Sequence, residues 1–226
     1  MKLFEKRTGL SGRRRGYFCG VKIYSLPARK EKKNIMLFPE SKIAHRYLDG
    51  LYGIEIGAAS YQPFGLRTIN VNYSDDYANQ PSGEKFFGNK AARVDIIANG
   101  DDLPFKDGVL DFVLSSHVLE HFFDPIKAVL EWRRVLKPGG ILFMIVPYKD
   151  RMFDKDKERT KLAELAARHK GEIKLTADAD EHTHHSFWIT QDVAELVNHC
   201  GGFRILETHD VDDTRHDGFI VVAEKI

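Results

Sequence analysis

The chain has 226 residues, of which 42% are hydrophobic and 30% charged, as expected for one globular α/β domain with appendages. Two distant cysteines, Cys19 and Cys200, exclude a disulfide framework and a CxxC metal site, and they suit a reducing cytoplasm. The longest apolar run, ILFMIV, is too short to span a bilayer, and no apolar stretch of the signal-peptide kind follows the basic start.

The net charge of +1 hides an uneven distribution. The first 50 residues hold 13 Lys and Arg against 4 Asp and Glu, whereas the other 176 residues hold 21 against 29. We therefore separate a basic N-terminal arm, residues 1–38, from a domain over residues 39–226. The arm either folds back on its acidic domain or meets an anionic partner, such as a phosphorylated sugar, a lipid surface or nucleic acid. No nucleic-acid motif accompanies the charge, which favours the first interpretation.

The first predicted elements lead into a sheet. Loose alternation over residues 17–26 is typical of a strand or hairpin, and the basic residues before it are expected to be mobile. Ser41 is a candidate helix cap, because apolar residues recur at helical spacing behind it. Residues 54–57, IEIG, then predict the first strand of a sheet.

Two further strands follow at unequal distances. The run Thr68–Asn72 predicts the second strand, after a connection too short for an ordinary crossover helix. Residues 74–92 show no helical period and predict a long loop, of the kind that is usually functional or mobile. The third strand is expected at Arg93–Ala98.

The stretch from Val109 to Pro147 reads as a complete strand, helix and strand. A buried strand is expected over Leu110–Leu114, and Asp124 followed by Pro125 is a helix start. The sequence KPGG ends that helix before an apolar strand, which gives a right-handed parallel crossover. Ligands should therefore bind at the carboxyl ends of the strands, where several polar residues gather. These are Ser115, Ser116, His117, Glu120, His121 and the neighbouring Pro147.

Beyond Pro147 the chain becomes charged. Residues 154–169 have good helix propensity and interrupt the expected alternation, so we interpret residues 151–188 as an inserted helix and His-rich loop that could cover the site. Thr190 is expected to cap a last helix that ends at Gly201.

Two stretches of the sequence strongly resemble the class I S-adenosylmethionine-dependent methyltransferases, in particular the small-molecule type 11 branch. They are LPFKDGVLDFVLSSHVLEH and, after it, RRVLKPGGILFMIVP. The resemblance covers roughly residues 50–226. It implies a Rossmann-like α/β fold, with a mostly parallel seven-stranded sheet closed by an antiparallel C-terminal strand pair. It also implies S-adenosylmethionine as cofactor.

The resemblance implies the cofactor residues position by position. The family's turn E/D-x-G-x-G-x-G matches at Glu55 and Gly57, but Ala59 and Tyr61 stand at its second and third glycines. Glu55, Gly57 and Ala59 would hold the methionine end. Asn72 replaces the acid that accepts hydrogen bonds from the ribose, with Asp75 and Asp76 nearby as substitutes.

For the adenine, the family's acid position is occupied by Asn99, and Asp101 or Asp102 could serve instead. The alternative is that these two aspartates cap a turn before Pro104. Ser116, at the end of the fourth strand, completes the predicted cofactor set.

Catalytic candidates are the histidines near the acceptor: His117, His121 and His184. The alternative for the first two is that Glu120 and His121 secure the turn after the strand through backbone hydrogen bonds. His184 belongs to a cluster over residues 178–185 that could bind a divalent ion, contact substrate or be a solvated loop. Its spacing matches no fixed metal motif, so we assign no metal, and the resemblance favours substrate contact.

The leading hypothesis is methyl transfer to an O or N atom of a small molecule or saccharide. The alternative is a module of the same fold that has lost cofactor binding and acts in interaction or substrate holding, since several anchoring positions are altered. A nicotinamide-dependent oxidoreductase would need a G-x-G-x-x-G turn, which is absent.

Overall fold

The structure, a computed structural model, describes residues 41–58, 64–74, 93–175 and 183–226, together with the backbones of three short N-terminal strands. Several features named above lie outside the described residues: Ala59, Tyr61, Asp75, Asp76, the rest of the loop to residue 92, and residues 176–182.

The N-terminal strands are β1 (Phe4–Thr8), β2 (Arg14–Phe18) and β3 (Val21–Ile23). They form a three-stranded antiparallel sheet in the order β1-β2-β3. The sequence indicated a strand or hairpin over residues 17–26 but not the strand β1, which has no apolar alternation.

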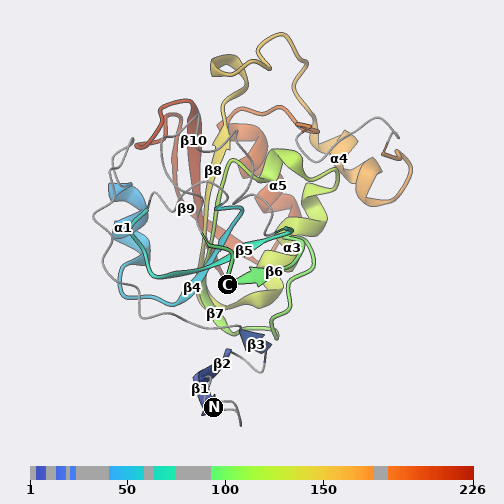
Figure 1. The fold of residues 1–226 in the computed structure, drawn as a ribbon. Helices are drawn as coiled ribbons and strands as arrows, with labels where there is room; N and C mark the ends of the chain where they lie inside the picture. The colour runs from blue at the N-terminus through green and yellow to red at the C-terminus, as the bar shows by residue number, and fades with distance from the viewer. Residues whose placement is uncertain are drawn as a thin grey trace.

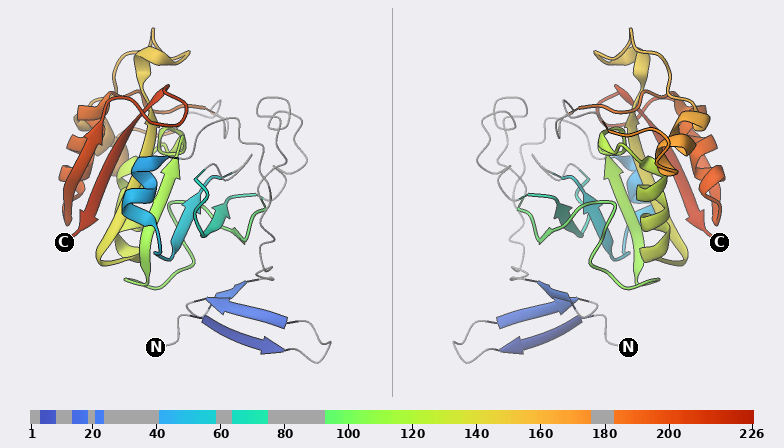
Figure 2. Two further views of the ribbon diagram at one scale, coloured as in Figure 1. Left: turned by 90° about the vertical axis from the view of Figure 1, so that its left-hand side faces the viewer. Right: turned by 90° about the vertical axis from the view of Figure 1, so that its right-hand side faces the viewer.

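Seven strands form the main sheet, in the order β6-β5-β4-β7-β8-β10-β9 (Figures 1 and 2). Their bounds are β4 Gly53–Ile56, β5 Thr68–Asn72, β6 Ile96–Ile97, β7 Leu110–Ser116, β8 Leu136–Pro147, β9 Phe203–His209 and β10 Gly218–Lys225. The third strand is shorter than predicted. The second begins and ends at the predicted residues.

Strands β4 to β8 pair in parallel, and β10 runs antiparallel to both β8 and β9. Chain order reverses between β4 and β7, which are neighbours in space. The predicted fold, a mostly parallel seven-stranded sheet with an antiparallel C-terminal pair, is therefore confirmed. In such sheets ligands bind beyond the carboxyl ends of the strands, at the point where the order reverses.

Helices cover both faces of the sheet (Figure 1). Helix α1 (Lys42–Leu48) packs on one face with a core around Phe112 and Phe143. The opposite face carries α3 (Pro125–Val135), α4 (Leu162–His169) and α5 (Thr190–Cys200), whose core includes Trp132 and Trp188. Short 3-10 turns, η2 (Leu119–His121) and η3 (Lys149–Arg151), follow β7 and β8.

Two of the predicted helix starts are confirmed by their caps. The Ser41 hydroxyl accepts a hydrogen bond from the Ala44 amide at 2.9 Å, and the Asp124 carboxylate accepts one from the Lys127 amide at 3.0 Å. Each satisfies an amide that has no partner inside its helix.

The start of the last helix was predicted wrongly in one respect. The Thr190 hydroxyl does not cap α5 but donates to Asp210 at 2.5 Å. The Asp192 carboxylate instead accepts from the Ile189 amide at 3.0 Å, which ties down the residue that precedes the helix.

The predicted helix over residues 154–169 is only half formed. Helix α4 begins at Leu162, because the residues before it are held by tertiary contacts. The Arg159 guanidinium binds the Asp192 carboxylate at 2.6 and 2.9 Å, and Thr160 exchanges hydrogen bonds with the backbone of Phe187. These contacts need an extended chain and override local helix propensity. Among the described residues, no helix has the length and apolar character needed to cross a membrane.

Candidate functional site

The turn after β4 contains a glycine that no other residue could replace without strain. Gly57 has φ +75°, and a Cβ added to it would lie 2.5 Å from a methyl carbon of Val118. Its amide donates to the Val71 carbonyl at 2.9 Å. The missing side chain thus lets the end of β4 approach the segment that follows β7.

Glu55 is buried inside β4, where one of its carboxylate oxygens accepts from the Thr68 hydroxyl at 3.2 Å. The acid of the predicted turn therefore lies in the sheet beside Gly57. Ala59 lies outside the described residues, so its contribution stays a prediction.

The side-chain amide of Asn72, at the carboxyl end of β5, uses only its oxygen in a hydrogen bond to the described residues. Its Oδ1 accepts from the Tyr73 amide at 2.9 Å, which fixes the orientation of the side chain. Its Nδ2 is buried and has no hydrogen-bond partner among the described residues. A buried donor without a partner is costly, so this position suits a ligand oxygen. The sequence suggested the amide oxygen as the binding atom, whereas the geometry leaves the nitrogen as the atom in need of one.

The residues expected to hold the adenine form a turn after β6. The Asp102 amide donates to the Asn99 carbonyl at 3.1 Å, and the Asn99 side chain is exposed. Asp101 forms an ion pair with Lys127 of α3 at 2.9 Å, whereas Asp102 is exposed. Of the three, Asp101 is thus tied to the fold, and Asn99 and Asp102 present their side chains to solvent.

His117 directly follows β7 and has a strained backbone, with φ +53°. Its amide donates to the Ile145 carbonyl of β8 at 2.9 Å, and the preceding Ser116 is half-buried at the strand end. The His117 Nε2 lies 3.3 Å from Asp217 Oδ1, an ion-pair distance without hydrogen-bond alignment. Such strain at a polar strand end is common at functional sites.

Asp217 is held in a tight loop before β10. Arg215 binds its Oδ2 at 2.7 and 3.1 Å. Burial alone would raise the pKa of Asp217, but the contact with His117 and the charges of His117 and Arg215 outweigh it and hold that pKa below its usual value. The carboxylate beside His117 is therefore charged at neutral pH.

Asp212 organises the same loop. It is fully buried and accepts hydrogen bonds from the amides of Thr214, Arg215 and Gly218 and from the Thr214 hydroxyl, at 2.6 to 2.9 Å. Burial raises the pKa of Asp212, but these hydrogen bonds outweigh it and lower the pKa to about 2.

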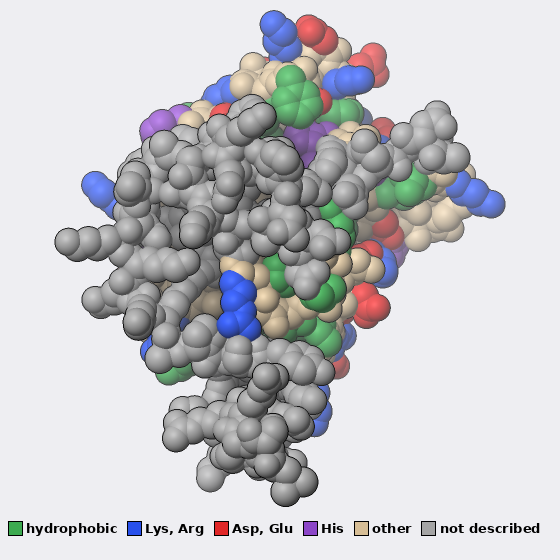
Figure 3. Space-filling model, viewed as in Figure 1, with side chains coloured by type: hydrophobic (Ala, Val, Ile, Leu, Met, Phe, Trp, Pro, Cys, Tyr) green, Lys and Arg blue, Asp and Glu red, His purple; other side chains and the backbone are tan. Residues whose placement is uncertain are grey.

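The other two predicted catalytic histidines lie together. The rings of His121 and His184 meet edge to face, with centroids 4.8 Å apart, and Glu120 lies between them and His117. In Figure 3, histidine side chains are visible near the top of the molecule, next to apolar ones. This is the end where the parallel strands finish (Figure 2).

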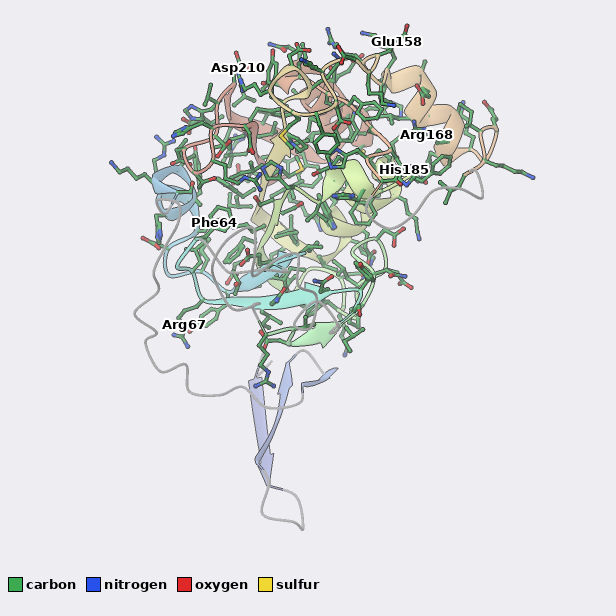
Figure 4. All side chains as sticks on the ribbon, turned by 45° about the horizontal axis from the view of Figure 1, so that its top comes forward. Phe64, Arg67, Glu158, Arg168, His185 and Asp210 are labelled. Atoms are coloured by element: carbon green, nitrogen blue, oxygen red, sulfur yellow. The ribbon has the colours of Figure 1, made fainter. Side chains whose placement is uncertain are left out.

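Helix α4 anchors the segment that carries His184. Arg168 donates to the His185 carbonyl at 2.9 Å and to the Ser186 hydroxyl at 3.1 Å. Figure 4 shows the side chains of Arg168 and His185 next to each other. The Arg168 guanidinium also lies over the Phe123 ring, 5.1 Å from the centroid. Helix α4 thus positions the segment that carries His184, a candidate site residue.

Sequence reasoning missed two carboxylates that matter here. Asp217 faces His117, and Asp154 binds His184 Nδ1 at 2.6 Å. Neither was detectable, because each lies far in the chain from its histidine and belongs to no motif. Glu120 was predicted to lie at the ligand end of the strands, with a backbone role in the turn as the alternative. Its carbonyl does accept from the His185 amide at 2.8 Å, and its side chain faces the histidines.

Known proteins resemble the chain in sequence. The type 11 family model, described as a methyltransferase domain, matches residues 52–144. An uncharacterized protein of Methanocaldococcus jannaschii is 32% identical over 138 residues, which make up 58% of this chain and 63% of that protein. An uncharacterized methyltransferase of Mycobacterium sp. (strain KMS) is 40% identical over 87 residues, or 37% of this chain and 31% of that one. The chain therefore spans less than two thirds of the length of these relatives.

Solved structures share the fold. An S-adenosylmethionine-dependent methyltransferase of Methanosarcina mazei superposes with a TM-score of 0.52 at 18% identity, over 83% of this chain and 99% of that one. One from Thermotoga maritima gives 0.50 at 19% identity, over 81% and 91%. The family implies S-adenosylmethionine as the cofactor, and the glycine turn and the unused Asn72 donor fit it. Residues 52–144 therefore match the type 11 methyltransferase family, and the chain shares its fold with S-adenosylmethionine-dependent methyltransferases.

Proposed function

We propose that this protein transfers the methyl group of S-adenosylmethionine to an oxygen or nitrogen atom of a small molecule or a saccharide. The proposal depends on the close approach of Gly57 to Val118. This contact places the turn that resembles a cofactor-binding turn next to the segment that bears the candidate histidines. When bound, the cofactor would supply an electrophilic methyl carbon on a sulfonium, with the neutral thioether of S-adenosylhomocysteine as the leaving group.

The chain's own residues would divide the work of binding. Glu55, Gly57 and Ala59 would hold the methionine end. The Asn72 nitrogen would donate to a ribose oxygen, which satisfies the buried donor described above. Asn99, Asp101 and Asp102 would flank the adenine, and Ser116 would close the site at the end of β7.

His117 is the best candidate for the base that takes the acceptor's proton. Two carboxylates face its ring, Asp217 Oδ1 at 3.3 Å from Nε2 and Glu120 Oε1 at 4.0 Å from Nδ1. Both stabilise the positive charge that an imidazole gains when it accepts a proton. His121 and His184 would line the acceptor side. For the basic arm, residues 1–38, we favour folding back on the acidic domain, and contact with an anionic partner is the alternative.

Calorimetric titration with S-adenosylmethionine and S-adenosylhomocysteine tests cofactor binding. We expect micromolar binding, weakened about tenfold in Asn72→Ala, because one hydrogen bond contributes about 1.4 kcal/mol at most in such a site. Asn198→Ala, an exposed asparagine on α5, is the matched control and should bind as the wild type does. No binding by the wild type would instead support the alternative module that has lost its cofactor.

Formation of S-adenosylhomocysteine over a panel of hydroxylated and amino-bearing small molecules and saccharides tests the acceptor class. His117→Asn keeps a residue type that tolerates positive φ but removes the base, so the rate should fall by about 10²–10⁴-fold while cofactor affinity stays unchanged. His199→Asn, on the exposed surface of α5, is the control. Cofactor binding without turnover of any acceptor in the panel would refute the proposed acceptor class.

A further inference from the structure

Glu120 is a buried carboxylate without a hydrogen bond. Its side chain is only 1% exposed, and neither of its oxygens has a hydrogen-bond partner among the described residues. Moving a carboxylate out of water costs several kcal/mol unless an opposite charge compensates it. Something positively charged should therefore belong beside Glu120.

Two imidazole nitrogens lie next to this carboxylate at distances typical of ligands around a common centre. His121 Nε2 is 3.8 Å and His184 Nε2 is 4.0 Å from Glu120 Oε1. The ligand atoms of the three residues all lie within 4.8 Å of one another. The contacts to Oε1 are too long for hydrogen bonds, so direct pairing with charged histidines would satisfy Glu120 poorly.

The outer nitrogens of both rings already have acceptors. His184 Nδ1 lies 2.6 Å from Asp154 Oδ2, and His121 Nδ1 lies 3.2 Å from the Thr183 carbonyl. An acceptor at Nδ1 keeps the proton there and leaves the lone pair of a neutral ring on Nε2, the atom that faces Glu120. A carboxylate or carbonyl behind each histidine is the usual outer shell of a metal site.

We propose that Glu120, His121 and His184 bind one divalent transition-metal ion, for which Zn²⁺ is the best match. Two imidazoles and one carboxylate form a ligand set typical of zinc sites that keep a fourth position open. Ligands on one tetrahedral zinc lie roughly 3.3 Å apart, given bond lengths of about 2.0–2.1 Å. Binding would therefore shorten the two distances to Glu120 Oε1, now 3.8 and 4.0 Å, by about 0.5–0.7 Å.

The sequence did not predict this site, because its ligands come from two separate segments. His184 belongs to the histidine-rich loop, whereas Glu120 and His121 belong to the turn η2 after β7. No fixed spacing in the chain links them.

An ion at this site would also bind an acceptor hydroxyl and make it more acidic. His117 lies near enough to take the proton, because its Nδ1 is 4.0 Å from Glu120 Oε1. This role rests on the proposed methyl transfer. Binding of the metal itself does not, and it can be measured without cofactor or acceptor.

The test uses full-length protein purified without a histidine tag. After dialysis against Zn²⁺ and then against metal-free buffer, elemental analysis should find about one zinc per chain, and thermal melting should shift upward with added Zn²⁺. Glu120→Gln should lose the bound zinc and the shift, and Asp154→Asn should weaken binding by about 10–100-fold. His209→Ala removes a histidine that pairs with Glu207 outside the cluster, and it should bind zinc as the wild type does.

A wild type that binds no more zinc than Glu120→Gln would overturn the proposal. If Glu120→Gln fails to fold, His184→Ala replaces it in the zinc measurement. The visible absorbance of Co²⁺ bound to the wild type then tests the same ligand set. Parallel titration with S-adenosylhomocysteine separates the two ideas. A wild type that binds S-adenosylhomocysteine but no zinc refutes the metal site alone, and a wild type that binds zinc but no S-adenosylhomocysteine refutes the methyltransferase proposal alone.

Discussion

Gly57→Ala is the most direct test of the turn on which the candidate site depends. The substitution acts in two separable ways. An alanine at φ +75° is strained whatever surrounds it, and its Cβ would lie 2.5 Å from Val118 Cγ2, well inside contact distance. The first effect belongs to the backbone and the second to packing between the ends of β4 and β7.

The two contributions can be given magnitudes. A left-handed conformation costs an L-residue about 1–2 kcal/mol, and forcing a methyl group into a packed region costs about 1–3 kcal/mol more. Gly57→Ala should therefore lower the free energy of unfolding by about 2–5 kcal/mol. Gly50→Ala is the matched control, because Gly50 has φ +77° but no heavy atom within 4 Å of an added Cβ. It should lose only the backbone part.

Urea unfolding followed by circular dichroism measures both variants. Adding Val118→Ala to Gly57→Ala removes the clashing methyl groups, so the double mutant should show a favourable coupling of about 1–3 kcal/mol. Gly57→Ala should also bind S-adenosylhomocysteine more weakly, whereas Gly50→Ala should not. The reasoning fails if the two glycine variants are equally destabilised or if Val118→Ala gives no rescue.

Three further predictions concern the rest of the domain. Asp212→Asn should lower stability at neutral pH by about 2 kcal/mol, since the folded pKa of about 2 lies below the ordinary value of 3.8. Because that pKa is depressed, the contribution is present above about pH 4 and is lost as the pH falls towards 2; acid unfolding of both proteins checks it, and equal acid sensitivity would contradict it. Burial raises the pKa of Cys200 to about 11, so in a Cys19→Ser background a thiol reagent at pH 8 should react slowly until the protein unfolds, and reaction at the free-thiol rate would contradict this. Removing residues 1–33 should leave the seven-stranded domain folded, because its strands pair only with one another in the described chain; a melting temperature lowered by more than about 10 °C would show that the arm is structural.

The parts of the fold that were predictable are those set by local signals. The caps at Ser41 and Asp124 lie next to the helices they begin, and the apolar run after KPGG lies in β8 as expected. The predicted boundary was wrong, because α3 ends at Val135 and β8 begins at Leu136, so KPGG belongs to the strand. The start of α4 was not predictable. Arg159 and Thr160 leave the helix because of partners more than 25 residues away, at Asp192 and Phe187. Helix propensity describes an isolated segment, whereas here hydrogen bonds to distant residues determine where α4 begins.

The candidate site also has parts that the sequence predicted and parts that it could not predict. Gly57 and Asn72 were located by their positions at predicted strand ends, which the sheet confirms. What Asn72 does with its amide depends on the Tyr73 backbone amide, a detail of the turn that no pattern encodes. The partners of the histidines, Asp154 and Asp217, could not be inferred, because they come from loops that only the closed fold brings near β7.

Two arginines tie the segment between β8 and α5 to the rest of the domain. Arg168 grips the backbone at His185 and Ser186, and Arg159 fastens the segment before α4 to α5. Both ends of the His184–Asp154 pair are thereby fixed by contacts that involve neither residue. The segment brings a carboxylate and a histidine as one pair next to Glu120, which lies in the turn η2 after β7. Chemistry at this site is therefore set jointly by the turn η2 after β7 and by the segment between β8 and α5.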